Sequence, residues 1–78
     1  MPRFYFHLHD DLDAVDEEGV ECVDRETAMA RAEGEARQLA AEEVRRGELH
    51  LDHSIVVADD RGQVIATVMF RDCVLIKG

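Results

Sequence analysis

The chain has 78 residues, enough for one domain with a small hydrophobic core. Its 46% hydrophobic and 35% charged residues are typical of a folded globular protein. The 18 acidic residues against 9 basic ones give a formal net charge of −9. Because a field of this sign repels phosphate backbones and anionic lipid headgroups, we expect neither a nucleic acid nor a membrane as a partner.

The first predicted element is a strand over residues 3–9, in which apolar and polar side chains alternate. Phe4, Phe6 and Leu8 fall on one face of this strand. Alternation with a period of two indicates a strand that is buried on one side. An acidic loop follows over residues 10–18, where few apolar residues interrupt the carboxylates.

A short strand over residues 19–23 and an amphipathic helix over residues 25–46 come next. Asp24 is a good N-cap, because its carboxylate can accept an orphan backbone N–H and lies at the positive end of the helix dipole. Gly47 suits the left-handed conformation that ends many helices. The apolar stripe of the helix is rich in alanine and comprises Ala28, Met29, Ala32, Ala36, Leu39 and Ala40.

The outer half of this helix carries further small residues, Ala30, Gly34 and Ala41. Two interpretations remain open for them. Alanine is the best helix former and can occupy exposed positions for that reason alone. Alternatively, small residues allow a second helix to approach closely in an oligomer.

Two further strands are predicted over residues 54–58 and 63–70. The turn between them should place Gly62 in a left-handed conformation. The element order β-β-α-β-β then predicts an α+β fold, in which an antiparallel four-stranded sheet carries the helix on one face. We expect the whole chain, residues 1–78, to form this single domain.

The expected register of the hairpin pairs Val57 with Ile65, and Val56 with Ala66. Both faces of the hairpin are then apolar, and an apolar segment at residues 73–76 adds to this surface. One alanine-lined helix can cover only one face of the sheet. Large exposed apolar patches usually mark an interaction surface.

We therefore expect a homodimer or higher homo-oligomer, or an unidentified protein partner. The leading hypothesis is a small, non-enzymatic module that self-associates or binds another protein. The residues expected to form its interaction surface are Val56, Val68, Phe70, Val74 and Ile76.

Motifs for nucleotide-dependent or covalent catalysis are missing from the sequence. The 5 glycines are scattered rather than gathered in a phosphate-binding loop, and Ser54 is the single serine. We therefore expect no enzymatic activity, no catalytic residue and no cofactor.

Histidines form the one pattern that could bind a metal. His7 lies close to His9, and His50 lies close to His53. Imidazole and carboxylate ligands suit zinc and similar divalent ions, so metal binding is the alternative function. Spacing alone does not show that the two pairs converge, and no metal site is assigned. In the other interpretation, the first pair covers the polar sheet face and the second pair lies in a linker.

Two cysteines, Cys22 and Cys73, are too few for a disulfide scaffold of this length. We expect both to be small buried hydrophobic residues. The first residues contain no hydrophobic signal region, so a cytoplasmic location is expected.

Four segments resemble a known family: the aromatic opening at residues 1–7, the turn at 16–19, the helix end at 45–47 and the hairpin at 57–62. They are similar to short uncharacterised proteins common in rhizobia and related alphaproteobacteria, a domain family of unknown function. The resemblance implies a bacterial, cytoplasmic, stand-alone domain, and it brings no substrate and no catalytic residue. A regulatory role like that of small antitoxin-like domains is a further alternative, by analogy of architecture only.

Overall fold

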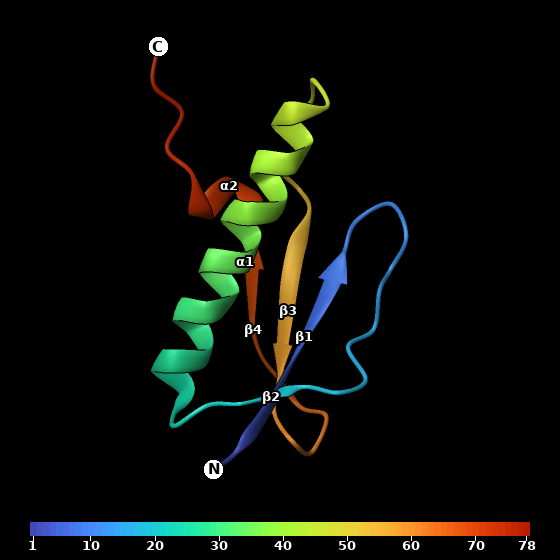
Figure 1. The fold of residues 1–78 in the computed structure, drawn as a ribbon, viewed down its shortest axis with the longest axis vertical. Coiled ribbons are helices and arrows are strands. Elements are labelled where there is room, and N and C mark those ends of the chain that lie inside the picture. The colour runs from blue at the N-terminus through green and yellow to red at the C-terminus, as the bar shows by residue number, and fades with distance from the viewer.

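An antiparallel sheet with one long helix on one of its faces makes up most of the protein (Figure 1). The computed structural model describes residues 1–78. The strands are β1 (Arg3–His9), β2 (Val20–Glu21), β3 (Ser54–Ala58) and β4 (Val64–Met69), in the spatial order β2-β1-β3-β4. The helices are α1 (Arg25–Arg45) and a single turn, α2 (Phe70–Cys73). The predicted α+β fold, with four antiparallel strands and one main helix, is confirmed.

Helix α1 begins and ends at the predicted signals. The carboxylate of Asp24 accepts a hydrogen bond from the backbone N–H of Thr27 at 2.8 Å. At the other end Gly47 has a φ of 95°, and the N–H of Glu48 donates to the carbonyl of Glu43. This glycine-based cap satisfies carbonyls that the last helical turn would otherwise leave unpaired.

The hydrophobic core lies between α1 and the sheet. The alanine stripe of the helix is buried as predicted, in residues Ala28, Ala32, Ala36 and Ala40. Small side chains let the helix lie close to the strands, which present Phe4, Phe6, Ile55, Val57 and Val68 to it. The two cysteines are free thiols buried in the same core, as expected.

The β3–β4 hairpin forms, but its predicted register is wrong by one residue. Ala58 pairs with Val64, as that register requires. Beyond this pair, Val57 pairs with Ala66, which leaves Ile65 as the extra residue of a β-bulge. Because strand side chains alternate between faces, one extra residue moves the rest of the strand to the opposite face.

The bulge explains where two of the predicted interaction residues lie. Val68 faces α1 opposite Ile55, and Phe70 is completely buried. Thr67 takes the outward position opposite Val56. The structure therefore places Val68 and Phe70 in the core rather than on a surface.

Two predicted strands are shorter in the structure. The second strand comprises only Val20–Glu21 of the expected residues 19–23. Strand β4 ends at Met69, because Phe70 begins the turn of α2 that the sequence pattern did not predict.

Candidate functional site

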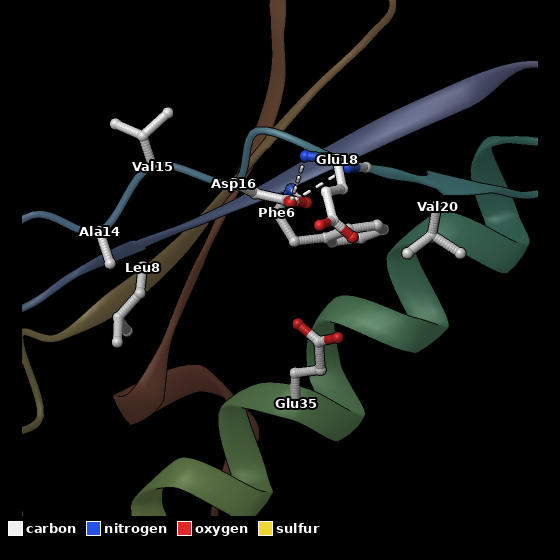
Figure 2. A pocket seen from close by; sticks show the side chains of 9 residues that line it. Phe6, Leu8, Ala14, Val15, Asp16, Glu18, Val20 and Glu35 are labelled. Carbon is white, nitrogen blue, oxygen red and sulfur yellow. Dashed lines mark hydrogen bonds between the residues drawn. The ribbon is translucent and has the colours of Figure 1, made fainter.

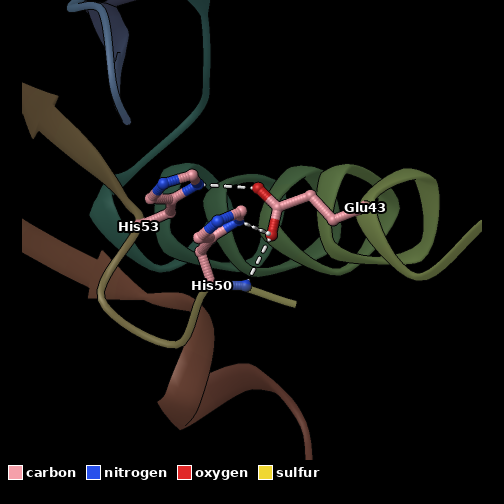
Figure 3. Close-up of side chains that lie close together, drawn as sticks. All are labelled: Glu43, His50 and His53. Atoms are coloured by element: carbon pink, nitrogen blue, oxygen red, sulfur yellow. Dashed lines mark hydrogen bonds and ion pairs between the residues drawn. The ribbon is translucent and has the colours of Figure 1, made fainter. Parts of the chain in front are cut away.

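Glu43, His50 and His53 form a cluster of three potential metal ligands (Figure 3). Glu43 belongs to α1, and both histidines lie in the loop before β3. Glu43 Oε1 accepts a hydrogen bond from the backbone N–H of His50 at 2.8 Å and lies 3.3 Å from His50 Nδ1. Glu43 Oε2 lies 2.6 Å from His53 Nδ1. The cluster therefore ties the last turns of α1 to the loop that leads into β3.

Burial and charge act in opposite directions on this cluster. Glu43 is 6% exposed and His53 is 8% exposed. Burial alone would raise the pKa of Glu43, but hydrogen bonds from His50 and His53 outweigh it and lower the pKa below its usual value. Burial alone would lower the pKa of His53, but the hydrogen bond and charge of Glu43, helped by the charges of Asp11 and Asp10, raise it. The site thus favours an ionised carboxylate beside a protonated imidazole.

The two imidazole rings are not oriented to bind one metal ion together. A ring nitrogen binds a metal through a lone pair in the plane of its ring, at about 2.0–2.1 Å for zinc. The rings of His50 and His53 are stacked, with centroids 4.4 Å apart and planes 12° from parallel. One ion cannot lie in both planes, so a shared metal would require one ring to turn.

The other predicted histidine pair does not join this cluster. His7 Nδ1 accepts a hydrogen bond from the backbone N–H of Asp16 at 3.0 Å. His9 forms an ion pair with Asp13 of the acidic loop. The two predicted pairs therefore do not converge.

Glu43 is the member of the cluster that sequence reasoning missed. It comes three residues after Ala40, so it continues the buried face of the helix. A carboxylate at such a position requires partners, because an unpaired buried charge is costly. The helical period, together with the two histidines that follow in the sequence, could therefore have predicted that Glu43 belongs to the cluster.

An open pocket of about 380 Å³ lies between the acidic loop, β1 and α1 (Figure 2). Its lining is half apolar and carries three acids: Phe6, Leu8, Ala14, Val15, Asp16, Glu18, Gly19, Val20 and Glu35. Figure 2 shows Glu18 of the loop and Glu35 of α1 pointing toward one another across the pocket. The pocket thus combines an apolar surface with negatively charged side chains around it.

Asp16 holds the loop in place beside β1. Its carboxylate accepts hydrogen bonds from the backbone N–H groups of Phe6, Glu18 and Gly19 at 3.1, 3.2 and 3.0 Å. Burial would raise the pKa of Asp16, but these bonds outweigh it and lower the pKa. The carboxylate of Glu18 itself has no hydrogen-bond or ion-pair partner, so it remains available to a ligand.

No helix covers the sheet face opposite α1, and the one acid that a strand contributes to this face is Glu21 of the edge strand β2, which forms an ion pair with Arg3. Strands β1, β3 and β4 contain no Asp or Glu at any position. At the centre of this face, Val56 lies between His7 of one neighbouring strand and Thr67 of the other. An antiparallel sheet with one solvated face normally alternates apolar and polar residues, but the outward residues of β3 and β4 carry no charge. We call the outward residues Tyr5, His7, Val56, Ala58, Thr67 and Met69 the outer sheet face.

The remaining predicted interaction residues lie beyond the sheet. Val74 is half-buried after α2, and Ile76 is 68% exposed. Neither belongs to the outer sheet face. Of the five predicted interaction residues, Val56 alone lies on that face.

The fold and its sites define a small acidic α+β domain. The chain belongs to a family described as a domain of unknown function (DUF6894), whose model matches residues 3–71. No curated protein and no solved structure matches the chain. Neither helix has the length and apolar character needed to cross a bilayer.

Proposed function

We propose that this protein is a small non-enzymatic module that self-associates through the outer sheet face. The observation that carries the proposal is the absence of acids from β1, β3 and β4, the strands that form this face, in a chain with a net charge of −9. Two such copies repel each other over most of their surfaces. A face without carboxylates is where they can approach most closely, and depletion of charge is typical of the centre of an interface.

Two-fold symmetry would place the outer sheet face against the same face of a second copy. Homodimers of this kind are the commonest oligomers of soluble proteins. Two sheets packed face to face bury their outward side chains in a layer about 10 Å thick. Val56 would lie near the centre of that layer, because β3 is an inner strand and Val56 has a neighbouring strand on each side.

Light scattering after size-exclusion chromatography tests the proposal. We expect a dimer for the wild-type chain and a weaker dimer for Val56→Asp, because the new carboxylate would be buried against its own copy. Leu12→Asp is the matched control, since it adds the same charge to a loop residue that is 83% exposed. Circular dichroism verifies that both variants fold. A wild-type chain that stays monomeric at all concentrations would rule the proposal out.

Divalent-metal binding is the second proposal, supported by the meeting of Glu43, His50 and His53. It is the weaker one, because a shared ion requires one of the stacked rings to turn. A thermal-shift titration with zinc decides it. The proposal requires stabilisation of the wild type that is lost in His50→Gln, and the lack of any shift would remove it.

A cytoplasmic location and an alphaproteobacterial origin stay predictions of the sequence. The same holds for the regulatory alternative, which no feature of either site favours over self-association.

A further inference from the structure

We propose that the pocket between the acidic loop, β1 and α1 binds residues 74–77 of a second copy of this chain. The inference rests on the proposed self-association, but it uses a different surface from the outer sheet face. Its occupant is an extended apolar segment followed by a cation.

The segment after α2 has the chemistry of a ligand rather than of a surface loop. Val74 is in an extended conformation with φ −130° and ψ 144°. Leu75 and Ile76 follow it, and they are 78% and 68% exposed. They are the two strongly exposed large apolar residues that are adjacent in the sequence, and Lys77 comes directly after them. The family match ends at residue 71, so this segment lies outside it.

The pocket complements this segment in both polarity and charge. The half-buried side chains of Leu8 and Val20, with the small exposed part of Phe6, offer apolar surface to the segment. Glu35 already contacts Arg31 at 3.4 Å, whereas Glu18 has no partner. The ammonium group of Lys77, the one lysine in the chain, is therefore expected to pair with Glu18.

The geometry favours a second copy as the source of the segment. In Figure 1 the chain leaves α2 on the side of α1 that faces away from the acidic loop, and the pocket is on the side that faces it. The four residues 74–77 span at most about 14 Å when fully extended, and within one chain they would have to pass around α1 to reach the pocket. Each copy offers one segment and one pocket, so a reciprocal exchange between two copies leaves neither unused.

Peptide binding tests the pocket independently of the oligomer. The probe is a labelled, end-capped peptide of residues 74–78, titrated into the full chain with Leu75→Ser and Ile76→Ser. These two changes disable the chain's own segment. We expect saturable binding, and roughly a tenfold or greater loss when the peptide carries the same two serines.

Charge reversal identifies the residues that the peptide contacts. Glu18→Lys should weaken peptide binding a few-fold, as expected for an exposed ion pair. Glu17→Lys is the matched control, because it makes the same change in charge at the neighbouring residue, which does not line the pocket. Replacing the lysine of the peptide by Glu should restore affinity to Glu18→Lys. No peptide binding, or equal effects of the two reversals, would overturn the inference.

The two self-association surfaces can be separated in the full chain. In a Val56→Asp background the segment exchange alone should hold a dimer, and Leu75→Ser with Ile76→Ser should dissolve it. If Val56→Asp leaves the oligomer unchanged while the segment variants dissolve it, the proposed interface at the outer sheet face is wrong and the proposed binding at the pocket is supported. If only Val56→Asp dissolves the oligomer and the peptide does not bind, the proposed binding at the pocket is wrong and the proposed interface at the outer sheet face is supported.

Discussion

Stability depends on proton binding at the pair formed by Glu43 and His53. The pKa of His53 is raised above 6.5, so its contribution is complete below pH 6.5 and is lost as the pH rises through the folded-state value. The pKa of Glu43 is lowered below 4.5, so its contribution is present above pH 4.5 and is lost as the pH falls through the folded-state value. The pair therefore stabilises the fold most between these two limits.

Urea unfolding at several pH values tests this pair. The wild-type free energy of unfolding should fall as the pH rises above 6.5 and through the folded-state pKa of His53. His53→Gln should cost about 1.5–3 kcal/mol at pH 6, as for a hydrogen bond to a charged group, and less at a pH above the folded-state pKa of His53. His9→Gln is the control, because its ion pair with Asp13 lies on the exposed surface. Equal pH profiles for wild type and His53→Gln would contradict this role.

At the scale of single residues, the sequence predicted two of the three members of the cluster, His50 and His53. His50 and His53 are near each other in the chain, so their closeness in space could be predicted from the sequence. Their contact with Glu43 depends on how the loop folds back onto α1, which is a tertiary event that spacing does not encode. His7 and His9 share a strand face, but hydrogen bonding to the acidic loop directs them elsewhere.

At the scale of elements, the interior glycine of α1 is a weak point. An added Cβ at Gly34 would meet no atom within 4 Å, so Gly34→Ala should stabilise the fold by up to about 1 kcal/mol. Gly19→Ala should destabilise it, because Gly19 has a φ of 70° and its Cβ would lie 2.9 Å from the carbonyl oxygen of Phe4. Thermal melts of the two variants measure both effects.

The same variant decides between the two interpretations of the outer helix face. Loss of the oligomer in Gly34→Ala, with the monomer fold intact, would place a second helix against Gly34. An unchanged oligomer with a higher melting temperature would mean that the alanines of this face serve helix formation alone.

Elements governed by local chemistry were predictable, and the hairpin register was not. Asp24 and Gly47 act within one turn of the helix, and the alanine stripe follows the helical period, so each could be read from neighbouring residues. The hairpin is apolar on both faces, so its alternation is compatible with either register. The contact of Val68 and Phe70 with the core selects the bulged register, and that contact is visible only in three dimensions.

At the scale of the whole molecule, charge opposes self-association. Added salt screens repulsion between two chains of net charge −9, because the Debye length falls from about 20 Å at 0.02 M to about 4 Å at 0.5 M. Dimerisation through the outer sheet face should therefore become stronger with salt. Sedimentation equilibrium of the Leu75→Ser, Ile76→Ser chain measures this dissociation constant without the segment exchange. A dimer weakened by salt would instead indicate attractive ion pairs between copies, against the proposed interface.

The extra residue at Ile65 makes the count of residues in β4 matter more than their hydrophobicity. Removing Ile65 would leave a regular hairpin in which Ala58 still pairs with Val64 and Val57 with Ala66, whereas one further inserted residue would exchange the two faces along the remainder of the strand. An insertion in this part of the hairpin would thus be more harmful than deletion of Ile65, since it would turn Val68 toward water and Thr67 toward α1.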